Sequence, residues 1–403
     1  MSNDTLPEIR FPEFTDEWEQ VKLKDVATVF DGTHQTPKYT ESGVKFVSVE
    51  NIKTLETEKY ISQEAYDSEY SKKQAEKGDV LMTRIGDIGT AKVIETDEPL
   101  AYYVTLALLK PNEIDSSFLA WLISSPEVQR NIWKRTLHIA FPKKINLGEI
   151  NQIEMNVPSL EEQTKIGTFF KQIDNTITLH QRKLDLLKET KKGFLQKMFP
   201  KNGAKVPEIR FPGFTEDWEQ RKLGELATIV RGASPRPIQD PKWFDTESDV
   251  GWLRIADVTE QDGRIYYLEQ HISKLGQEKT RVLVEPHLLL SIAATVGKPV
   301  VNYVKTGVHD GFLIFLNAIF DREFMFQWLE MFRPKWQKYG QPGSQVNLNS
   351  ELVRNQEILI PNNEEQQKIG SFFKQLDDTI ALHQRELDLL KETKKGFLQK
   401  MFV

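Results

Sequence analysis

Residues 161–199 read EEQTKIGTFFKQIDNTITLHQRKLDLLKETKKGFLQKMF, and residues 364–402 read EEQQKIGSFFKQLDDTIALHQRELDLLKETKKGFLQKMF. The two segments are identical at 33 of their 39 positions, at an offset of 203 residues. A second matching pair, residues 7–32 and 207–232, opens each half of the chain at an offset of 200. The chain is therefore a tandem duplication in which two similar frames enclose two segments that have diverged.

The diverged inserts, residues 33–158 and 233–361, align only at scattered positions. A chain of 403 residues is long enough for two domains, each with a hydrophobic core of its own. Two near-identical frames are expected to meet the same partner twice, whereas each insert meets something different. The predicted division is a first domain at 1–158, a first helix at 159–199, a second domain at 200–361 and a second helix at 362–403.

The composition is that of a globular chain with a polar outside, with 39% hydrophobic and 28% charged residues. No apolar run approaches the length of a membrane span, and the first residues, MSNDTLPEIR, do not resemble a signal peptide. The chain has no cysteine, which excludes disulfides and thiolate metal sites and is compatible with the cytoplasm. A net charge of −6 does not exclude nucleic-acid binding, because binding needs only a local basic face. We expect a cytoplasmic protein that does not enter a membrane.

Each repeated segment has the apolar spacing of a long coiled-coil helix. Apolar residues recur in alternating steps of four and three when His180 and Lys191 are counted in the series. Two such helices in one chain are expected to pair with each other, antiparallel, about a pseudo-two-fold axis. The predicted coiled-coil seam residues are Ile166, Phe170, Ile173, Ile177, Leu184, Leu187, Phe194 and Met198 in the first helix, and Ile369, Phe373, Leu376, Ile380, Leu387, Leu390, Phe397 and Met401 in the second.

An alternative is that each helix packs separately on its own domain as an ordinary amphipathic element. The apolar residues Phe169, Leu195 and Phe199 lie outside the seam, and we interpret them as a docking surface for another protein. His180 and His383 occupy equivalent seam positions. Neither has the Cys, His or carboxylate neighbours in its sequence pattern that a metal site requires, so we interpret both as polar residues that set the register.

The opening repeats place aromatic residues in a segment punctuated by proline. Phe11, Phe14 and Trp18 recur as Phe211, Phe214 and Trp218. We predict that they anchor each opening segment onto a core and do not stack on bases.

Each insert has the mixed pattern of an α+β domain. Helical spacing is found in residues 116–134 of the first insert and 323–332 of the second. Short apolar, β-rich runs separated by Gly and Asp turns predict strands. These runs are 44–49, 80–83, 92–94 and 104–109 in the first insert, and 251–255, 288–292, 299–303 and 312–316 in the second.

No motif of a known catalytic site is present in the sequence. A Walker A loop ends in Gly-Lys-Ser/Thr, but the only Gly-Lys pair, at Gly297, is followed by Pro299. The strings by which amino-methyltransferases hold a target base, the Gly-x-Ser-x-Gly elbow and the His-Glu-x-x-His zinc motif are all missing. We therefore predict no catalytic residue and no metal ligand, although an enzyme with an unrecognised site stays open as an alternative.

Two dissimilar domains, each followed by a near-identical helix that begins Pro-x-x-Glu-Glu-Gln-x-Lys-Ile-Gly, resemble the specificity (S) subunit of type I restriction-modification systems. The resemblance covers the whole chain. The pattern that opens each domain in that family is similar to residues 32–37 (GTHQTP) followed by 43–47 (GVKFV), and to residues 232–237 (GASPRP) followed by 251–258 (GWLRIADV).

Residues 78–86, GDVLMTRIG, are similar to the central strand of a domain in this family. The second copy, residues 288–297, keeps a hydroxyl residue at the position of Thr83 but has Ile292 where the first has Arg84. Arg84 is therefore expected to serve one domain only.

The resemblance implies that each insert is a target recognition domain that binds one half of a bipartite, asymmetric site in double-stranded DNA. It also implies that the helices form the spacer and dock two modification subunits, which carry the DNA methylation chemistry. Restriction subunits would complete the endonuclease complex. S-adenosylmethionine, ATP and Mg would be bound by these partner subunits, so the chain itself is expected to need no cofactor. A rigid spacer between two readers suits half-sites about one helical turn, roughly 34 Å, apart.

Base readout uses Arg, Lys, Asn, Gln and small hydroxyl side chains on exposed loops, and lysines favour phosphates. The candidate DNA-binding residues are His34, Lys38, Arg84, Lys143, Lys144 and Asn146 in the first domain, and Arg236, Lys242, Arg254, Lys298, Gln345 and Asn347 in the second. The rival hypothesis from another class is a coiled-coil adaptor whose two domains bind proteins and not DNA. A stand-alone nuclease lacks support from any motif.

Overall fold

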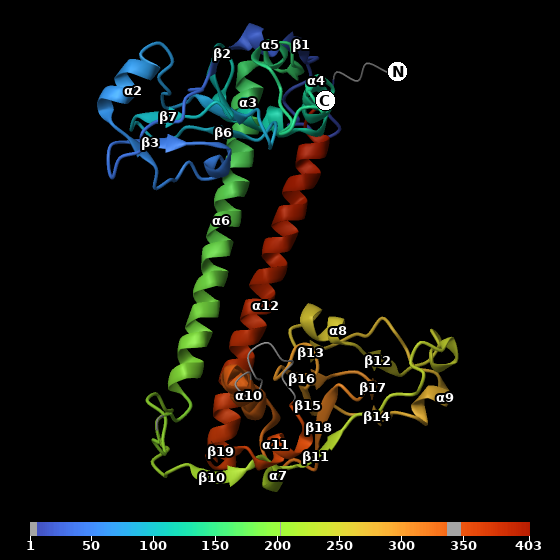
Figure 1. The fold of residues 1–403 in the computed structure, drawn as a ribbon. Coiled ribbons are helices and arrows are strands. Elements are labelled where there is room, and N and C mark those ends of the chain that lie inside the picture. The colour runs from blue at the N-terminus through green and yellow to red at the C-terminus, as the bar shows by residue number, and fades with distance from the viewer. Residues whose placement is uncertain (1–5, 202, 337–347) are drawn as a thin grey trace. The chain divides into compact units, whose positions relative to one another are not determined.

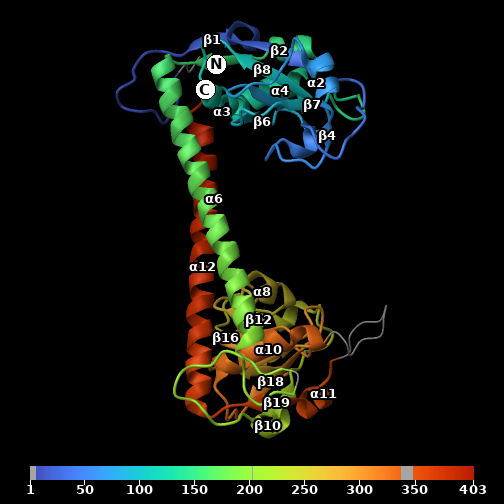
Figure 2. The same cartoon turned by 90° about the vertical axis from the view of Figure 1, so that its left-hand side faces the viewer.

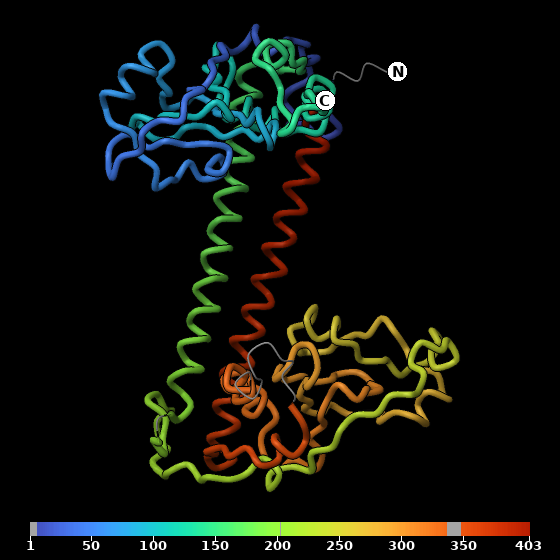
Figure 3. The backbone as a smooth tube through the Cα atoms, in the orientation of Figure 1, coloured from blue at the N-terminus to red at the C-terminus, as the bar shows by residue number. Residues whose placement is uncertain are grey.

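The computed structural model describes residues 6–201, 203–336 and 348–403, and it divides the chain into two compact units (Figure 1). Unit 1 consists of Met1–Arg182 together with Arg385–Val403, and unit 2 is Lys183–Gln384. Two helices of 38 residues each, α6 (Leu160–Lys197) and α12 (Asn363–Lys400), contribute to both units. Figure 3 traces both as unbroken coils, and Figure 2 shows the C-terminus of the chain within unit 1.

Unit 1 contains three small sheets that frame the predicted first domain. The largest has the order β2-β8-β5-β6 and is antiparallel throughout, and the second has the order β4-β3-β7. The strands are β1 (Glu19–Lys22), β2 (Ala27–Asp31), β3 (Val44–Val47), β4 (Tyr60–Ile61), β5 (Val80–Thr83), β6 (Ala91–Val93), β7 (Leu100–Tyr102), β8 (Leu106–Pro111) and β9 (Glu154–Val157). The helices are α1 (Leu23–Val26), η1 (Val49–Asn51), α2 (Gln63–Tyr70), α3 (Ser116–Ser124), α4 (Pro126–Arg135) and α5 (Leu147–Asn151).

Unit 2 repeats this plan with additions. Its main sheet, β11-β18-β15-β16-β13, gains a fifth strand that runs parallel to β16, and its second sheet has the order β12-β17-β14. The strands are β10 (Glu219–Lys222), β11 (Thr228–Arg231), β12 (Gly251–Leu253), β13 (Arg264–Ile265), β14 (Arg281–Leu283), β15 (Leu288–Ser291), β16 (Pro299–Asn302), β17 (Thr306–Val308), β18 (Phe312–Leu316) and β19 (Glu357–Ile360). The helices are α7 (Leu223–Leu226), η2 (Pro241–Trp243), α8 (Ile255–Glu260), α9 (Lys274–Gln277), α10 (Arg322–Trp336) and α11 (Ser350–Asn355).

The predicted α+β pattern is confirmed in both inserts, because all eight predicted strand segments contain a strand. One helix prediction is wrong in detail. Residues 116–134 form two helices, since Ser125 caps the second with its hydroxyl and Pro126 occupies its first turn, where a missing N–H costs nothing. The pairing of β1 with β9, and of β10 with β19, was not predicted. It joins the opening segment of each half to the strand just before its long helix.

The predicted anchoring of the opening segments onto the cores is confirmed for Trp18 and Trp218, which are buried, and for Phe11 and Phe211, which pack against the same cores. Phe14 and Phe214 are half-buried and belong to neither core, and each lies beneath a lysine of a long helix, Lys165 or Lys368. Trp18 is 3% exposed and packs edge-on against Phe118 and against Phe402 from the far end of the chain. Trp218 makes the same two kinds of contact in unit 2, with Phe324 and Phe199. Each unit therefore builds its core from its own domain, the first turns of one long helix and the last turns of the other.

The long helices run antiparallel in each unit. In unit 1 the ring of Phe169 lies 5.0 Å from that of Phe397, and in unit 2 Phe194 lies 5.1 Å from Phe372. All sixteen predicted seam residues are buried or half-buried. The alternative of separate packing describes only part of the arrangement, because the first turns of each helix pack against the domain core and against the other helix together.

The docking surface predicted from Phe169, Leu195 and Phe199 is wrong. Phe199 is 2% exposed in the core of unit 2, and the other two residues pack against the cores of their units. The last turns of each helix enter a domain core, so apolar residues beyond the seam are needed there. No helix within the described ranges is both long enough and apolar enough to cross a membrane.

Candidate nucleic-acid interface

The second glutamate of each EEQ sequence fastens a long helix to the opening segment of its unit. The Arg10 guanidinium donates two hydrogen bonds, of 2.7 and 2.8 Å, to the carboxylate of Glu162. Arg210 and Glu365 repeat the pair with the same two distances. Both carboxylates are 1% exposed or less, and a bidentate pair of this kind is among the stronger polar contacts in proteins. The identical residues thus fix the orientation of each helix at its first turn.

The glutamine of the EEQ sequence fastens the helix to the domain itself. The side-chain oxygen of Gln163 accepts a hydrogen bond of 3.0 Å from the backbone N–H of Asp115, which caps helix α3. Gln366 accepts one of 2.9 Å from Asp321, directly before helix α10. Domains that have diverged elsewhere therefore meet the long helices through the same contact. This shared frame is what allows the exposed parts of the two domains to differ.

Matching carboxylates on the long helices are used differently in the two units. In unit 1 the carboxylate of Asp174 forms an ion pair with the ammonium group of Lys394, at an N–O distance of 2.6 Å. In unit 2 the carboxylate of the matching Asp377 forms two ion pairs, with Lys191 at 2.6 Å and with Arg264 on strand β13 at 3.0 Å. Burial acts to raise the pKa of the Asp377 carboxyl, but the two cations outweigh it and hold the pKa below its usual value. Among the described residues, a cation from a domain strand reaches this carboxylate in unit 2, through Arg264, and not in unit 1.

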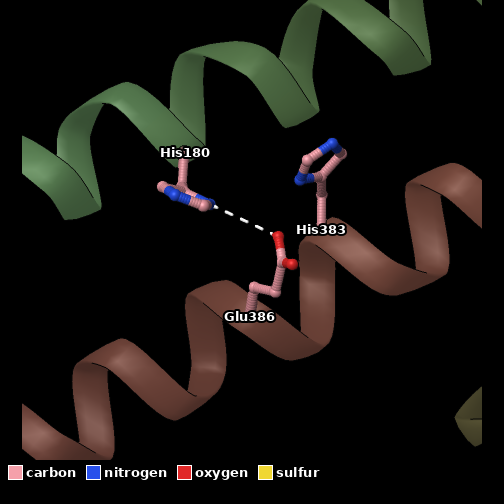
Figure 4. Close-up of side chains that lie close together, drawn as sticks. All are labelled: His180, His383 and Glu386. Carbon is pink, nitrogen blue, oxygen red and sulfur yellow. Dashed lines mark ion pairs between the residues drawn. The ribbon is translucent and has the colours of Figure 1, made fainter.

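His180 has a carboxylate neighbour, contrary to expectation. Its Nδ1 lies 3.7 Å from the carboxylate of Glu386, on helix α12 of the same unit (Figure 4). His383, also drawn there, precedes Glu386 by one turn of that helix. The pair joins α6 to α12 within the seam. The role of a polar register residue stays a prediction for both histidines.

In the first domain, four candidate residues lie around the ends of strands β2 and β5. The guanidinium of Arg84 forms an ion pair with Asp31, and Nε2 of His34 lies 2.6 Å from the second oxygen of the same carboxylate. The backbone of Lys143 and of Lys144 forms bridges to the segment that follows Arg84. The expectation that Arg84 is exposed is wrong, because its side chain is 8% exposed, while the side chain of His34 is 70% exposed.

Apart from Arg84, the first-domain candidates are on the surface. Lys38, Lys143, Lys144 and Asn146 are all exposed. The predicted loop over residues 138–146 is confirmed, since it connects α4 to α5. Arg84 supports this loop from below, because its Nε donates a hydrogen bond of 3.2 Å to the carbonyl of Ile145.

In the second domain, Arg236 is the candidate that most resembles this first cluster. Its guanidinium lies 2.6 Å from the carboxylate of Asp310, which also accepts a hydrogen bond from the hydroxyl of Ser234. The side chain of Arg236 is 68% exposed. The guanidinium tip of Arg236 is thus held by a carboxylate while the side chain stays open to solvent, where an arginine is able to meet a phosphate or a base edge.

Three further second-domain candidates, Lys242, Arg254 and Lys298, are held by carboxylates on the protein. Lys242 pairs with Asp240 and lies over the ring of Trp243, and Arg254 pairs with Asp257 and Glu269. Lys298 pairs with Asp262 and Glu330, and its side chain is only 12% exposed, so the expectation of an exposed lysine is wrong there. Gln345 and Asn347 lie outside the described residues.

Sequence reasoning missed Asp31 and Asp310, the carboxylates that organise each cluster, because acidic residues were not sought at a surface for DNA. Their placement gives a usable pattern, since Asp31 is the last residue of β2 and Asp310 lies two residues before β18, both in the main sheet of their unit. Sequence reasoning also missed Arg264. An arginine in a strand of two residues carries no signal of the buried pair that it makes.

The chain thus consists of two α+β domains, each with its own cluster of cations, and two near-identical long helices, which is the architecture of a two-domain protein with an internal repeat. The family described as the type I restriction modification DNA specificity domain matches the chain twice, at residues 15–189 and 215–392. The chain belongs to this family of specificity subunits.

Two relatives are similar in sequence to this chain over nearly its whole length. The chain is 25% identical over 408 residues to a putative type I restriction enzyme MjaX specificity subunit from Methanocaldococcus jannaschii, covering 96% of this chain and 93% of that protein. It is 21% identical to the MjaIX specificity subunit of the same organism, covering 96% and 92%.

The fold is similar to that of solved structures. An S subunit of a type I restriction-modification system from M. genitalium matches with a TM-score of 0.65 at 13% identity, covering 99% of both chains. A second structure, from work on complex assembly and conformational transition of the type I R-M system, matches with a TM-score of 0.57 at 17% identity and covers 94% of this chain and 96% of its own.

Proposed function

We propose that this specificity subunit binds double-stranded DNA through both domains, each reading one half of a bipartite, asymmetric site. The observation that carries the proposal is that the contacts between domain and long helix, made by the EEQ sequences, are the same in both units, while the cation clusters around Asp31 and Asp310 differ. Two different readers on one repeated support suit a site whose halves differ in sequence.

The long helices are proposed to dock two copies of a modification subunit. Leu179 and Leu186, seven residues apart on α6, are 66% and 67% exposed. Their counterparts Leu382 and Leu389 on α12 are 48% and 69% exposed. Large apolar side chains repeated on one helix face are typical of a surface that a partner helix covers. Since the same pair of leucines occurs on both helices, identical partners can bind twice.

In this proposal the partner subunits carry out the catalytic steps. The modification subunits would bind S-adenosylmethionine and transfer the methyl group, and restriction subunits would use ATP and Mg to complete an endonuclease complex. The chain itself would supply sequence recognition and spacing, as a non-catalytic subunit. With cellular DNA as its ligand, it would act in the cytoplasm.

The test is an exchange of one domain. Residues 33–158 are replaced by the matching insert of another specificity subunit, and both proteins are produced with the same modification subunit. Methylated sites in host DNA are then mapped by sequencing. One half of the methylated sequence is expected to change, while the other half and the gap between the halves stay the same, because unit 2 and the helices are untouched.

The matched control exchanges residues 233–361 instead, and only the opposite half is then expected to change. If both halves changed in either exchange, one domain would not read one half. Methyl transfer by the purified chain alone, with S-adenosylmethionine added, would contradict the assignment of chemistry to the partners.

A further inference from the structure

The loop between α4 and α5 in unit 1 carries two large apolar side chains at its tip. Ile139 is 100% exposed and Phe141 is 104% exposed, as open to water as in an unfolded chain. Apolar side chains of this size are usually covered, because each one buried removes a substantial unfavourable contact with water. The tip sequence, residues 139–142, is Ile-Ala-Phe-Pro.

The base of this loop is firmly held. The N–H of Leu137 donates a hydrogen bond of 2.8 Å to the carbonyl of Lys144, which closes the loop on itself. The N–H of Gly86 donates one of 2.9 Å to Lys143, and the N–H of Ile145 donates one of 3.0 Å to Arg84. The loop is thus joined to the segment that leaves the central strand β5. These hydrogen bonds hold the backbone at the base of the loop in place, so the side chains at its tip are carried on an ordered support.

An exposed aromatic residue braces one side of the loop. The ring of Trp133, at the end of α4, is 57% exposed and lies 4.1 Å from the ring of His138. The ammonium group of Lys143 lies 4.7 Å from the centre of the same indole ring. These contacts order the flanks of the loop and leave its apolar tip uncovered.

Two exposed lysines directly follow the tip. Lys143 and Lys144 are exposed, and neither forms an ion pair with any residue in the described ranges. Most other candidate cations are neutralised, as Arg84 is by Asp31 and Lys298 by Asp262 and Glu330. A surface with unpaired lysines beside exposed apolar groups complements a polyanion that also offers apolar contact.

We propose that Ile139 and Phe141 form an apolar wedge that inserts at a base step of duplex DNA and partly unstacks it. The inference rests on the proposed function and adds a mechanism of recognition in the first domain. Phe, Ile and Pro are among the residues that proteins use to wedge base steps open, while flanking lysines hold the phosphates. Steps of a pyrimidine followed by a purine unstack most easily, so the wedge contributes to sequence preference.

The test uses the full chain in complex with its modification subunit. The probe is a duplex that carries the methylated site mapped in the cell, with the fluorescent base 2-aminopurine placed at successive positions. Binding is expected to raise the fluorescence at one step in the half read by the first domain, because unstacking relieves quenching. Phe141→Ala is expected to abolish that rise and to weaken binding about 5- to 150-fold, the range for loss of one aromatic contact with a base.

Two matched variants identify the cause. Phe141→Leu keeps an apolar wedge and is expected to retain most of the affinity and the fluorescence rise. Ile319→Ala removes an isoleucine of unit 2 that is 60% exposed, and it is expected to change neither measurement. A DNA mismatch at the unstacked step is expected to restore part of the affinity of Phe141→Ala, since the cost of unstacking is then already met.

Unchanged affinity and fluorescence in Phe141→Ala would overturn the wedge. So would normal DNA binding with lost assembly of the modification subunit, because the loop would then be a protein-docking surface. Absence of DNA binding by the unaltered complex is a different result, and it would contradict the proposed function itself.

Discussion

At the scale of single residues, Arg84 shows how burial changes the role expected of a cation. Arginine is the commonest reader of guanine, yet the side chain of Arg84 points into the domain. It neutralises Asp31 and supports the carbonyl of Ile145 at the base of the exposed loop. Its contribution to DNA binding is therefore expected to pass through the shape of that loop.

Arg84→Met is expected to destabilise unit 1 by about 3 kcal/mol, because it leaves the carboxylate of Asp31 without its buried partner. The measurement is urea denaturation of the purified chain. His34→Ala is the matched control at the other oxygen of Asp31, and it is expected to cost less than about 0.5 kcal/mol because His34 is largely exposed. An Arg84→Met variant of normal stability that no longer binds DNA would instead indicate direct base contact.

At the scale of elements, the two domains are joined to the long helices unequally. In unit 2 the guanidinium of Arg264 reaches both Asp377 on α12 and Glu323 on α10, and it lies over the ring of Phe326. In unit 1 the matching Asp174 lines a cavity of about 260 Å³. In the second domain Arg264 therefore ties the domain to the long helix through Asp377. In the first domain a cavity lies beside the matching Asp174.

Asp377→Asn is expected to destabilise unit 2 by about 3 kcal/mol, since it removes the carboxylate shared by Lys191 and Arg264. Asp174→Asn is the matched control that the duplication supplies. The side chain of Asp174 is 41% exposed and pairs only with Lys394 among the described residues, so about 0.5 kcal/mol is expected. The free energy of unfolding is measured by urea denaturation. If it fell by the same amount in both variants, the two domains would not be joined to their helices unequally.

The same pair of variants predicts a dependence on pH. The pKa of Asp377 lies below its unfolded value, so this carboxylate stabilises the fold above the unfolded pKa of about 4. That stabilisation is lost as the pH falls through the folded pKa. The difference in free energy of unfolding between the unaltered chain and Asp377→Asn is therefore expected to be full at pH 7 and to shrink below about pH 4.

At the scale of the whole molecule, the duplication places two different domains and two near-identical long helices in one chain. Helices of 38 residues are about 57 Å long at 1.5 Å per residue. In the proposed function their length sets the gap between the half-sites. In that function the helices α6 and α12, which are near-identical in sequence, act as the ruler that sets the gap, and the two different domains would carry the sequence preference.

Insertion of one heptad at matched positions in α6 and α12 tests the ruler. The insertion preserves the seam and lengthens each helix by about 10 Å, close to three base pairs of DNA at 3.4 Å each. The preferred gap in the methylated sequence, mapped by sequencing, is expected to grow by about two to three base pairs. The two to three added base pairs also rotate one half-site around the duplex by about 70 to 105°, which is expected to lower the affinity.

The control places seven residues in α6 alone. That variant is expected to lose assembly, because its seam no longer matches the seam of α12. An unchanged gap in a well-folded, active double insertion would show that the helices are not the ruler.

The sequence by itself determined the features that depend on local pattern. An identity of 33 positions in 39 established the duplication, and heptad spacing predicted two helices that the structure begins at Leu160 and Asn363. The alternation of short apolar runs with turns predicted the α+β class. These features follow from backbone geometry and side-chain period, which act over a few residues and are visible in the order of the chain.

Only the tertiary structure decided which charges are available. Arg84 and Lys143 look equally suited to DNA in the sequence. In the structure Arg84 pairs with Asp31, 53 positions before it, and its side chain is 8% exposed, whereas Lys143 is exposed to solvent. The exposed tip at Phe141 and the core position of Phe199 are likewise indistinguishable by residue type. Burial and ion pairing depend on contacts between residues distant in the chain, and those contacts exist only once the sheets and helices have packed.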